Sequence, residues 1–402
     1  MAGEAVKPAK NSKTKKKSVK KWRFFNLSNG FDMYFFVLLM IVLVTGLVTL
    51  YSASHVYAFN YEGDSYFYIR KQLMWIGFGL VAMFAASFVD YHIFHKFAWL
   101  IWFLSIILLI VALVMPTASG VNRWIRIPGL GQFQPSELAK FALILLFAHL
   151  ISLNYKRMKK VGITLLLFGI LGFTCILVLI EPHLSGTLLI GMLGFAMMFI
   201  GGTSIWWLLG VIGVGVSGVV GAVVLLNYEQ DRIAVWLHPL EVFARTDVIE
   251  EFGRRGRDLA WQTVQSLYAI GSGGLLGQGP GNSRQKHLFL PEPQNDFIFS
   301  VYCEEMGFVG AVLVIVLFGL LVWRGFTIGL RAPDKFGCLL AIGLTLQIGL
   351  QVAINIAVVS NLIPNTGISL PFFSYGGTSI LMLMAQMGVV LSVSRQAHME
   401  KS

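Results

Sequence analysis

Residues 273–323 read GGLLGQGPGNSRQKHLFLPEPQNDFIFSVYCEEMGFVGAVLVIVLFGLLVW, so a polar loop runs directly into a long apolar segment. The apolar part, 297–323, is longer than the roughly 20 residues that a helix needs to cross a bilayer. Immediately before it, five charged or titratable side chains fall within the thirteen positions 284–296. Because a charged side chain at a membrane costs free energy, such a group of residues is by default a candidate functional site. The stretch therefore predicts a membrane-spanning helix with a reaction centre at its mouth.

The rest of the chain has the composition of a membrane protein. Its 402 residues are 56% hydrophobic and 13% charged, whereas soluble domains carry about 25% charged residues. The three cysteines, Cys175, Cys303 and Cys338, lie in apolar runs without the spacing of metal ligands. That pattern favours buried thiols over a disulfide framework or a zinc site. We expect one membrane domain and no soluble domain.

The apolar runs predict an all-α, polytopic membrane protein with about ten transmembrane helices. The expected spans are roughly 33–53, 71–89, 97–115, 137–153, 162–180, 186–201, 205–227, 297–323, 338–360 and 374–394. They divide the chain into a basic tail (1–32), a membrane domain (33–394) and a short C-terminal tail (395–402). A long loop, 228–296, separates the seventh span from the eighth. Apolar residues at helical spacing predict two short amphipathic helices within this loop.

The distribution of basic residues predicts the orientation. Eight lysines and one arginine lie between Lys7 and Arg23. Nucleic-acid binding is one interpretation of this run, but a cytoplasmic tail beside anionic lipid is the simpler one. We therefore expect no nucleic-acid partner. With ten spans both termini are cytoplasmic, and the long loop and the other unusual polar stretches lie on the extracytoplasmic side.

One outer stretch places Arg123 and Trp124 shortly before the fourth span, which begins at Glu137 with Lys140 one turn later. Helix capping and an intrahelical Glu–Lys pair would explain this pattern without any function. However, both charges sit at the bilayer boundary, where they are costly unless they face a cavity. We therefore favour the interpretation that this stretch forms the wall of a polar cleft.

Two further outer stretches are polar. Glu181–His183 ends the fifth span, where a simple helix break explains the sequence as well as a site does. Residues 361–379, NLIPNTGISLPFFSYGGTS, predict a broken or re-entrant segment, which is tolerated at membrane depth only where protein buries it or it lines a cavity. Free N–H groups at Gly376 and Gly377, beside Ser374, could hold a phosphate oxygen.

Asp296 is a lone carboxylate at the start of the eighth span. It suits a single general base that acts on a hydroxyl, while cations stabilise the charge on the leaving group. Arg284, Lys286 and His287, with the arginines between 232 and 257, are candidates for binding a pyrophosphate. Capping of the eighth span is the alternative role for Asp296.

Together these motifs resemble those of the SEDS family (shape, elongation, division and sporulation). The similarity rests on NRW at 122–124, QPSELAK at 134–140, the loop 274–310 and NTGISLPFFSYGGTS at 365–379. It covers nearly the whole membrane region. The resemblance implies a ten-helix peptidoglycan glycosyltransferase of the bacterial cell membrane that polymerises lipid II at the outer face. It also implies a class B penicillin-binding protein and other divisome membrane proteins as partners, and a divalent cation, Mg²⁺ or Mn²⁺, whose ligands the sequence does not identify.

The resemblance places the family's essential aspartate on Asp296 and its paired polar residues on Glu137 and Lys140. Two departures accompany it. His183 stands where many relatives have an aspartate, and Gln294–Asn295 replaces a common His-Thr. The expected substrate-binding set is Arg123, Trp124, Glu137, Lys140, Arg284, Lys286, His287, Ser374, Gly376 and Gly377.

The implied reaction joins lipid II to an undecaprenyl-linked glycan chain with inversion and releases undecaprenyl pyrophosphate. A lipid II flippase and a non-catalytic divisome scaffold are the rival hypotheses. The clustering of polar motifs on one side favours the polymerase, since a flippase needs chemistry at both faces. The lysine-rich tail and residues 366–370 lean towards a role in division over elongation or sporulation.

Overall fold

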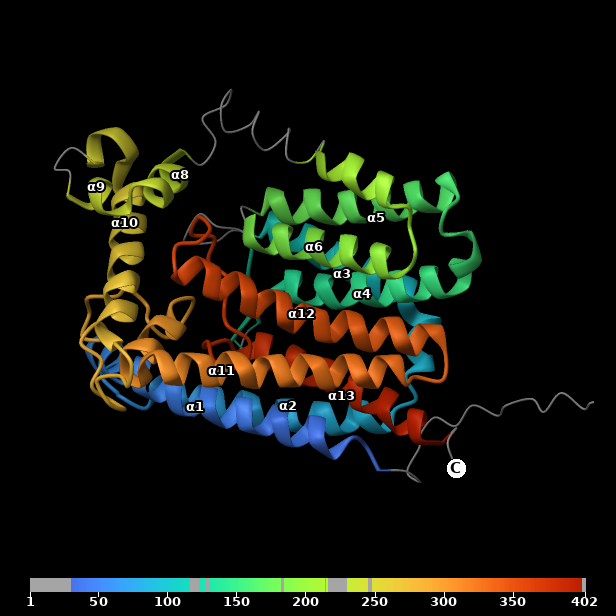
Figure 1. Cartoon of the computed structure of the whole chain (residues 1–402), viewed down its shortest axis with the longest axis horizontal. Helices are drawn as coiled ribbons and strands as arrows, with labels where there is room; N and C mark the ends of the chain where they lie inside the picture. The colour runs from blue at the N-terminus through green and yellow to red at the C-terminus, as the bar shows by residue number, and fades with distance from the viewer. Residues whose placement is uncertain are drawn as a thin grey trace, which may run out of the picture.

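The computed structural model describes residues 30–115, 123–127, 131–181, 184–213, 215, 230–244 and 248–399. Long helices run side by side along one axis and form a bundle (Figure 1). The elements are α1 Met33–Glu62, α2 Phe67–Phe88, α3 His92–Val114, β1 Ile125–Ile127, β2 Gly131–Phe133, α4 Pro135–Asn154, η1 Tyr155–Arg157, α5 Val161–Ile180, α6 Leu184–Ile200, α8 Gln230–Leu237, α9 Pro239–Ala244, α10 Val248–Gly273, α11 Ile298–Leu330, α12 Lys335–Val359 and α13 Gly377–Met399.

The expectation of an all-α, multi-pass membrane protein is confirmed. Within the described ranges, eight helices are long and apolar enough to cross a membrane, and the shorter apolar α6 accompanies them. The expected span 205–227 is helical at 205–213, and most of its remainder lies outside the described residues. The total of ten spans therefore stays a prediction.

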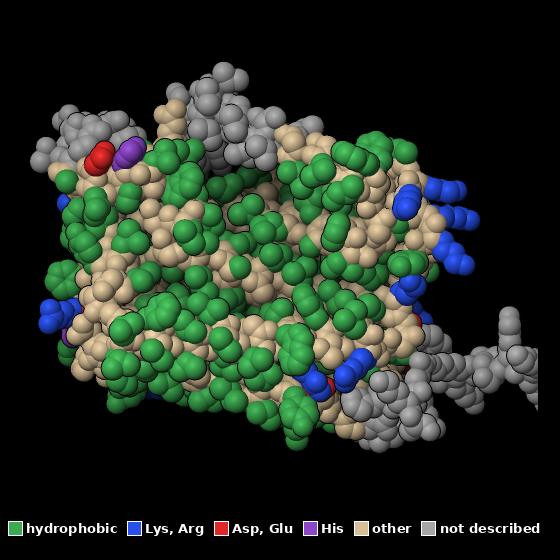
Figure 2. All heavy atoms as spheres, in the orientation of Figure 1, with side chains coloured by type: hydrophobic (Ala, Val, Ile, Leu, Met, Phe, Trp, Pro, Cys, Tyr) green, Lys and Arg blue, Asp and Glu red, His purple; other side chains and the backbone are tan. Residues whose placement is uncertain are grey.

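Three helices form the centre of the bundle. The most apolar windows of α4, α12 and α13 are 78%, 72% and 72% buried, whereas those of α1, α2, α3, α5 and α11 are 28–39% buried. The outer helices present large apolar side chains such as Leu100, Phe103 and Leu313 on their surfaces. Figure 2 shows hydrophobic side chains spread over the visible face of the bundle, with Lys and Arg gathered mainly at the end where the chain terminates. Lipid is the solvent that such a surface requires.

The helices in the long loop before α11 differ from the two short helices that the sequence predicts. The described residues form α8, α9 and the 26-residue α10, which lies across the ends of the long helices (Figure 1). One continuous helix forms because its apolar face continues through Val264 to Ile270 without a proline. The Ser266 hydroxyl then donates to the Val359 carbonyl at the end of α12 (2.7 Å). This contact docks α10 on the end of the bundle.

Several helix limits also differ from the sequence estimate. α1 continues past residue 53 to Glu62 and stops at Gly63, whose left-handed backbone (φ 72°) caps the helix. α11 extends to Leu330 and is interrupted at Gly307 (φ 65°, ψ −167°). There the backbone of Gly277 packs so closely that a Cβ on Gly307 would lie 2.3 Å from the Gly277 nitrogen. α13 begins at Gly377, and residues 361–376 form the irregular segment that the sequence predicts.

Candidate active site

A cavity of about 750 Å³ opens at the end of the bundle where α10 lies. Residues from the first turns of α2, α4, α6 and α13 line it, together with the β1–β2 hairpin, the loop before α11 and the segment 367–376. Helix N-termini carry partial positive charge and unpaired N–H groups. Four of them around one cavity make it suited to an anionic ligand.

Asp296 lines this cavity, and the backbone that carries it is fixed at three consecutive carbonyls. The Gln294 carbonyl accepts from the Tyr375 N–H (2.8 Å), and the Asn295 carbonyl accepts from the Ser374 hydroxyl (2.8 Å). The Asp296 carbonyl accepts from the Asn355 side-chain amide (2.7 Å). The aspartate is therefore held by α12 and by the irregular segment before α13, both distant in sequence.

The Asp296 carboxylate is half-buried and, among the described residues, accepts no hydrogen bond. Burial raises its pKa to about 6, the positive charge of Arg123 opposes that rise, and the negative charge of Glu292 adds to it. A base with a pKa near the working pH combines availability with proton affinity. Gly367 (φ 67°) lies alongside, where a Cβ would come within 3.1 Å of Asp296 Oδ2. The glycine therefore leaves room for the carboxylate.

Glu137 and Lys140 lie one turn apart near the start of α4, at the cavity wall. The Lys140 Nζ donates to Glu137 Oε1 at 2.7 Å, and both side chains are buried. The second carboxylate oxygen, Oε2, is buried and has no hydrogen-bond partner in the described part of the chain. An ion pair with one unused carboxylate oxygen can still accept from, or coordinate, a ligand.

Arg123 and Trp124 line the cavity from the strand side. The hairpin that follows them is docked on α13, because the Thr378 hydroxyl donates to the Gln132 carbonyl (3.1 Å). The charge of Arg123 acts on two carboxylates, Asp296 and Glu181. Burial raises the pKa of Glu181 to about 8, and Arg123 opposes that rise.

The segment before α13 brings Gly376 and Gly377 to the cavity, but it does not leave all of their N–H groups free. The Gly376 N–H donates to the Gln72 side-chain oxygen (3.3 Å). At Gly377, a Cβ would lie 2.3 Å from Trp75 Nε1, so the glycine allows α13 to approach α2. Ser374 is buried, donates to the Asn295 carbonyl and accepts from the Leu370 N–H (2.8 Å). Its contacts position the Asp296 loop.

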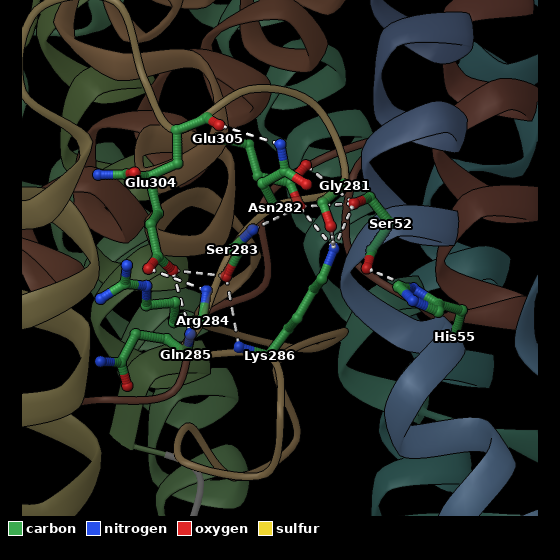
Figure 3. Close-up of polar contacts among 11 residues, drawn as sticks. Ser52, His55, Gly281, Asn282, Ser283, Arg284, Gln285, Lys286, Glu304 and Glu305 are labelled. Atoms are coloured by element: carbon green, nitrogen blue, oxygen red, sulfur yellow. Dashed lines mark hydrogen bonds and ion pairs between the residues drawn. The ribbon is translucent and has the colours of Figure 1, made fainter.

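Arg284, Lys286 and His287 lie outside the Asp296 cavity. The fully buried Lys286 pairs with Glu305 of α11 (2.9 Å) and donates to the Gly281 carbonyl (2.6 Å). Figure 3 shows the ammonium group of this lysine pointing towards Ser52 of α1, to whose hydroxyl it donates (3.2 Å). Arg284 lines a separate, smaller cavity beside α10, and the His287 side chain is exposed. Their roles in substrate binding stay predictions that this geometry does not favour.

The neighbouring Glu304 belongs to the same buried group, which we call the Glu304–Glu305 cluster: Ser52, Ser283, Lys286, Glu304 and Glu305. Glu304 accepts from the Ser283 hydroxyl (2.5 Å) and from the backbone N–H groups of residues 284 and 285 (3.0 and 3.2 Å). Glu305 accepts from Ser52 (2.6 Å) and Lys286. The cluster fastens the loop to α1 and α11 (Figure 3).

Comparison with known proteins agrees with this architecture. The family model described as "Cell cycle protein", for FtsW, RodA and SpoVE, matches residues 32–399. The chain belongs to the FtsW/RodA/SpoVE family. It is 39% identical to "Stage V sporulation protein E" of Bacillus subtilis (strain 168), over 91% of this chain and 98% of that protein. It is 36% identical to "Probable peptidoglycan glycosyltransferase FtsW" of Geobacter sp. (strain M18), over 91% and 97%.

Solved structures of the family share the fold. The Thermus thermophilus rod shape determining protein RodA aligns with a TM-score of 0.64 and 26% identity, covering 92% of this chain and 98% of that one. A chain from "Structural coordination of polymerization and crosslinking by a peptidoglycan synthase complex" aligns with a TM-score of 0.72, the same identity and the same coverage. The resemblance to a family of shape, elongation, division and sporulation proteins is confirmed, because the matching family model and relatives are those of FtsW, RodA and SpoVE.

Sequence reasoning on this family member missed the contribution of α2. Lys71, Tyr68 and Trp75 line the cavity, yet α2 reads as an ordinary span with a basic residue at its start. A lysine near the start of an apolar helix was the available signal. Gln351 of α12 also lines the cavity from within a span. His183, the departure from the family pattern, lies outside the described residues.

Proposed function

We propose that this protein is a peptidoglycan glycosyltransferase that polymerises lipid II, with Asp296 as its general base. The observation that carries the proposal is a half-buried carboxylate that accepts no hydrogen bond from described residues, at the wall of a cavity that three basic side chains and four helix N-termini also line. Similar proteins support the activity: one relative is named a probable peptidoglycan glycosyltransferase, and one structural neighbour belongs to a peptidoglycan synthase complex.

In the proposed reaction Asp296 removes the proton from the 4-hydroxyl of the acceptor sugar in lipid II. That oxygen attacks the anomeric carbon of the growing chain, the bond from this carbon to the pyrophosphate oxygen breaks, and undecaprenyl pyrophosphate leaves with the electron pair. Attack opposite the leaving group inverts the anomeric configuration. One carboxylate suffices, because cations can stabilise the leaving group without protonating it.

Positive charge for the pyrophosphate comes from three side chains and four helix ends. Lys71, Arg123 and Lys140 line the same cavity as Asp296. The first turns of α2, α4, α6 and α13 face it too. A guanidinium can pair with phosphate bidentately, while an ammonium acts as a point charge. In a water-poor site at the membrane surface these groups stabilise developing charge more strongly than they would in water.

A divalent cation fits the residues present. Mg²⁺ is commonly held by one or two carboxylates plus substrate phosphates and water. Glu137 would hold it, because its Oε2 is buried at the cavity wall without a partner among the described residues. Bound there, the ion would neutralise charge on the pyrophosphate. Lys140 keeps the other oxygen of Glu137 in place (2.7 Å).

The proposed topology puts the cavity on the extracytoplasmic side and both termini in the cytoplasm of the bacterial cell. The accumulation of Lys and Arg at the opposite end of the bundle supports this orientation. We propose a class B penicillin-binding protein as partner, with other divisome proteins, and a septal role in cell division. A lipid II flippase stays the second candidate, because the buried side-chain amide of Gln347, on the central helix α12, lacks hydrogen-bond partners among the described residues.

The test is polymerisation of lipid II by the purified full-length protein with its penicillin-binding partner. Wild type is compared with Asp296→Asn, which keeps the size but removes the base. Glu241→Gln, which removes an exposed carboxylate on α9, is the matched control. We expect glycan strands from wild type and the control, and a loss of about 10²–10⁴-fold in Asp296→Asn. Wild-type rates in a folded Asp296→Asn protein would show that Asp296 is not the base. If even wild type with its partner makes no strands, the result would support the flippase or the scaffold.

A further inference from the structure

Asn355 lies near the end of α12 and is completely buried. Its side-chain nitrogen donates two hydrogen bonds, one to the Asp296 carbonyl (2.7 Å) and one to the Ile368 carbonyl (2.6 Å). The first acceptor belongs to the loop that carries the proposed base. The second belongs to the segment that passes beside the carboxylate of that base. One amide therefore joins α12 to both walls of the cavity around Asp296.

The orientation of this amide is determined by its partners. Two carbonyl oxygens face it, and only the NH₂ end of the amide can donate to them. The opposite end, Oδ1, is buried and has no hydrogen-bond partner within the described structure. An unpaired buried acceptor destabilises a fold, so packing alone would favour an apolar residue at this position. What Asn355 supplies is the donation of both of its hydrogens.

The two carbonyl groups that accept from Asn355 belong to the backbone segments that surround the Asp296 carboxylate. Ile368 follows Gly367, whose Cα is so close to Asp296 Oδ2 that a Cβ would lie 3.1 Å from it. The Ser185 hydroxyl also holds the Gly367 carbonyl (3.3 Å). Ser374 and Tyr375 hold the two residues before Asp296. Within the described residues, Asn355 alone holds the carbonyl of Asp296 itself.

We infer that Asn355 is a positioning residue for the glycosyl transfer, which sets the place of the Asp296 carboxylate by fixing its loop against residues 367 and 368. The inference rests on the proposed function and extends it to the interior of the membrane bundle. Without the amide, two carbonyl oxygens would face each other with no donor between them, and the loop and the segment would separate. Displacement of a reacting group by about 1 Å can cost on the order of 10²-fold in rate.

The experiment compares Asn355→Ala and Asn355→Asp with wild type in the full-length protein with its partner. Asn355→Asp keeps the shape but, when ionised, offers no donor. Gln386→Ala is the matched control, because it removes another buried amide (2% exposed) from a central helix. Asn355→Ser, which retains one donor, serves if the other variants fold poorly. The readouts are kcat, KM and the pH dependence of kcat/KM.

We expect kcat to fall by about 10–100-fold in Asn355→Ala and Asn355→Asp, with KM changed by less than about threefold and Gln386→Ala near wild type. The acid limb of the pH profile should also move to lower pH. Burial holds the pKa of Asp296 near 6, against the opposing charge of Arg123, so a released, better solvated carboxylate titrates closer to its usual range. The control should leave this limb in place.

A kcat within about twofold of wild type in Asn355→Asp, a change confined to KM, or an unmoved acid limb would each overturn the inference. Asp296→Asn is measured alongside to separate two kinds of failure. If Asp296→Asn is inactive while the Asn355 variants behave as wild type, the positioning role fails and the proposed base stands. If Asp296→Asn is fully active, both fail.

Discussion

The Asp296 cavity and the Glu304–Glu305 cluster come from the same stretch of sequence, yet they treat charge in opposite ways. In the cluster, the Lys286 ammonium and the carboxylates of Glu304 and Glu305 all form hydrogen bonds with other residues of the fold. Their donor–acceptor distances include 2.5, 2.9 and 3.3 Å. At the cavity, the Asp296 carboxylate and Glu137 Oε2 have no partner among the described residues. Satisfied charges hold the loop in place, and unsatisfied charges face the space where a ligand would bind.

The difference shows how to separate structural from functional charge in a membrane protein. A buried charge is tolerated when it is fully paired, and it destabilises the fold otherwise. Unpaired groups gathered around one cavity are therefore explained by what they bind. Position in the sequence does not make this distinction, since Lys286 and Asp296 are only ten residues apart.

Two lysine substitutions should show the largest difference between the Glu304–Glu305 cluster and the Asp296 cavity. Lys286→Met leaves Glu305 buried (4% exposed) without its cation, and we expect the free energy of unfolding to fall by about 3–5 kcal/mol. Lys71→Met removes an exposed cation at the cavity and should lower the polymerisation rate without lowering stability. Thermal unfolding in detergent and lipid II polymerisation measure the two effects. Equal stability of the two variants would contradict the comparison.

The pH dependence of polymerisation tests the unpaired state of Asp296. Burial raises its pKa to about 6, and the base acts only when ionised. Activity should therefore be half-maximal near pH 6 and fall about tenfold for each pH unit below it. Because the folded pKa is raised, protonation favours the folded state, so stability should rise as the pH falls through 6. An acid limb centred near pH 4 would mean that the carboxylate is paired or fully solvated.

Alanine substitutions at two glycines test whether the close packing of Gly367 against the Asp296 carboxylate matters for the reaction. Gly367 and Gly202 both have left-handed backbones (φ 67° and 87°), but a Cβ at Gly202 would meet no atom within 4 Å. Alanine at either position should cost about 1 kcal/mol of stability from backbone strain. Only Gly367→Ala should also reduce kcat, by roughly tenfold, since its methyl group crowds Asp296. Circular dichroism and polymerisation rates distinguish the two effects.

The smallest effects are expected from the polar residues of the loop that lie outside the cavity. His287 is exposed, and Arg284 lines the separate cavity beside α10. His287→Ala and Arg284→Gln should leave kcat/KM within about threefold of wild type. A loss above tenfold in either variant would restore the hypothesis that these residues bind the pyrophosphate. It would also break the division between the two regions.

Much of the architecture followed from the sequence. Long apolar runs predicted the helices, and the motifs around Glu137, Asp296 and Gly376 predicted residues that the fold gathers at one cavity. The prediction of two short helices in the long loop was wrong at α10, which is one helix of 26 residues. For α2 as a cavity wall the only signal was Lys71, and a lone lysine at the start of a span resembles any interfacial lysine.

What the sequence alone determined is membrane insertion, family membership and the kinds of side chain available. Those properties depend on local composition and on motifs that can be read along the chain. Tertiary structure alone decided which charges are satisfied. Glu305 receives its hydrogen bond from Ser52, 253 positions away, and Asp296 is held by Asn355, 59 positions away. Such pairing depends on how helices pack in three dimensions, so the same loop supplies both a lysine that is paired within the fold and the aspartate that we propose as the base.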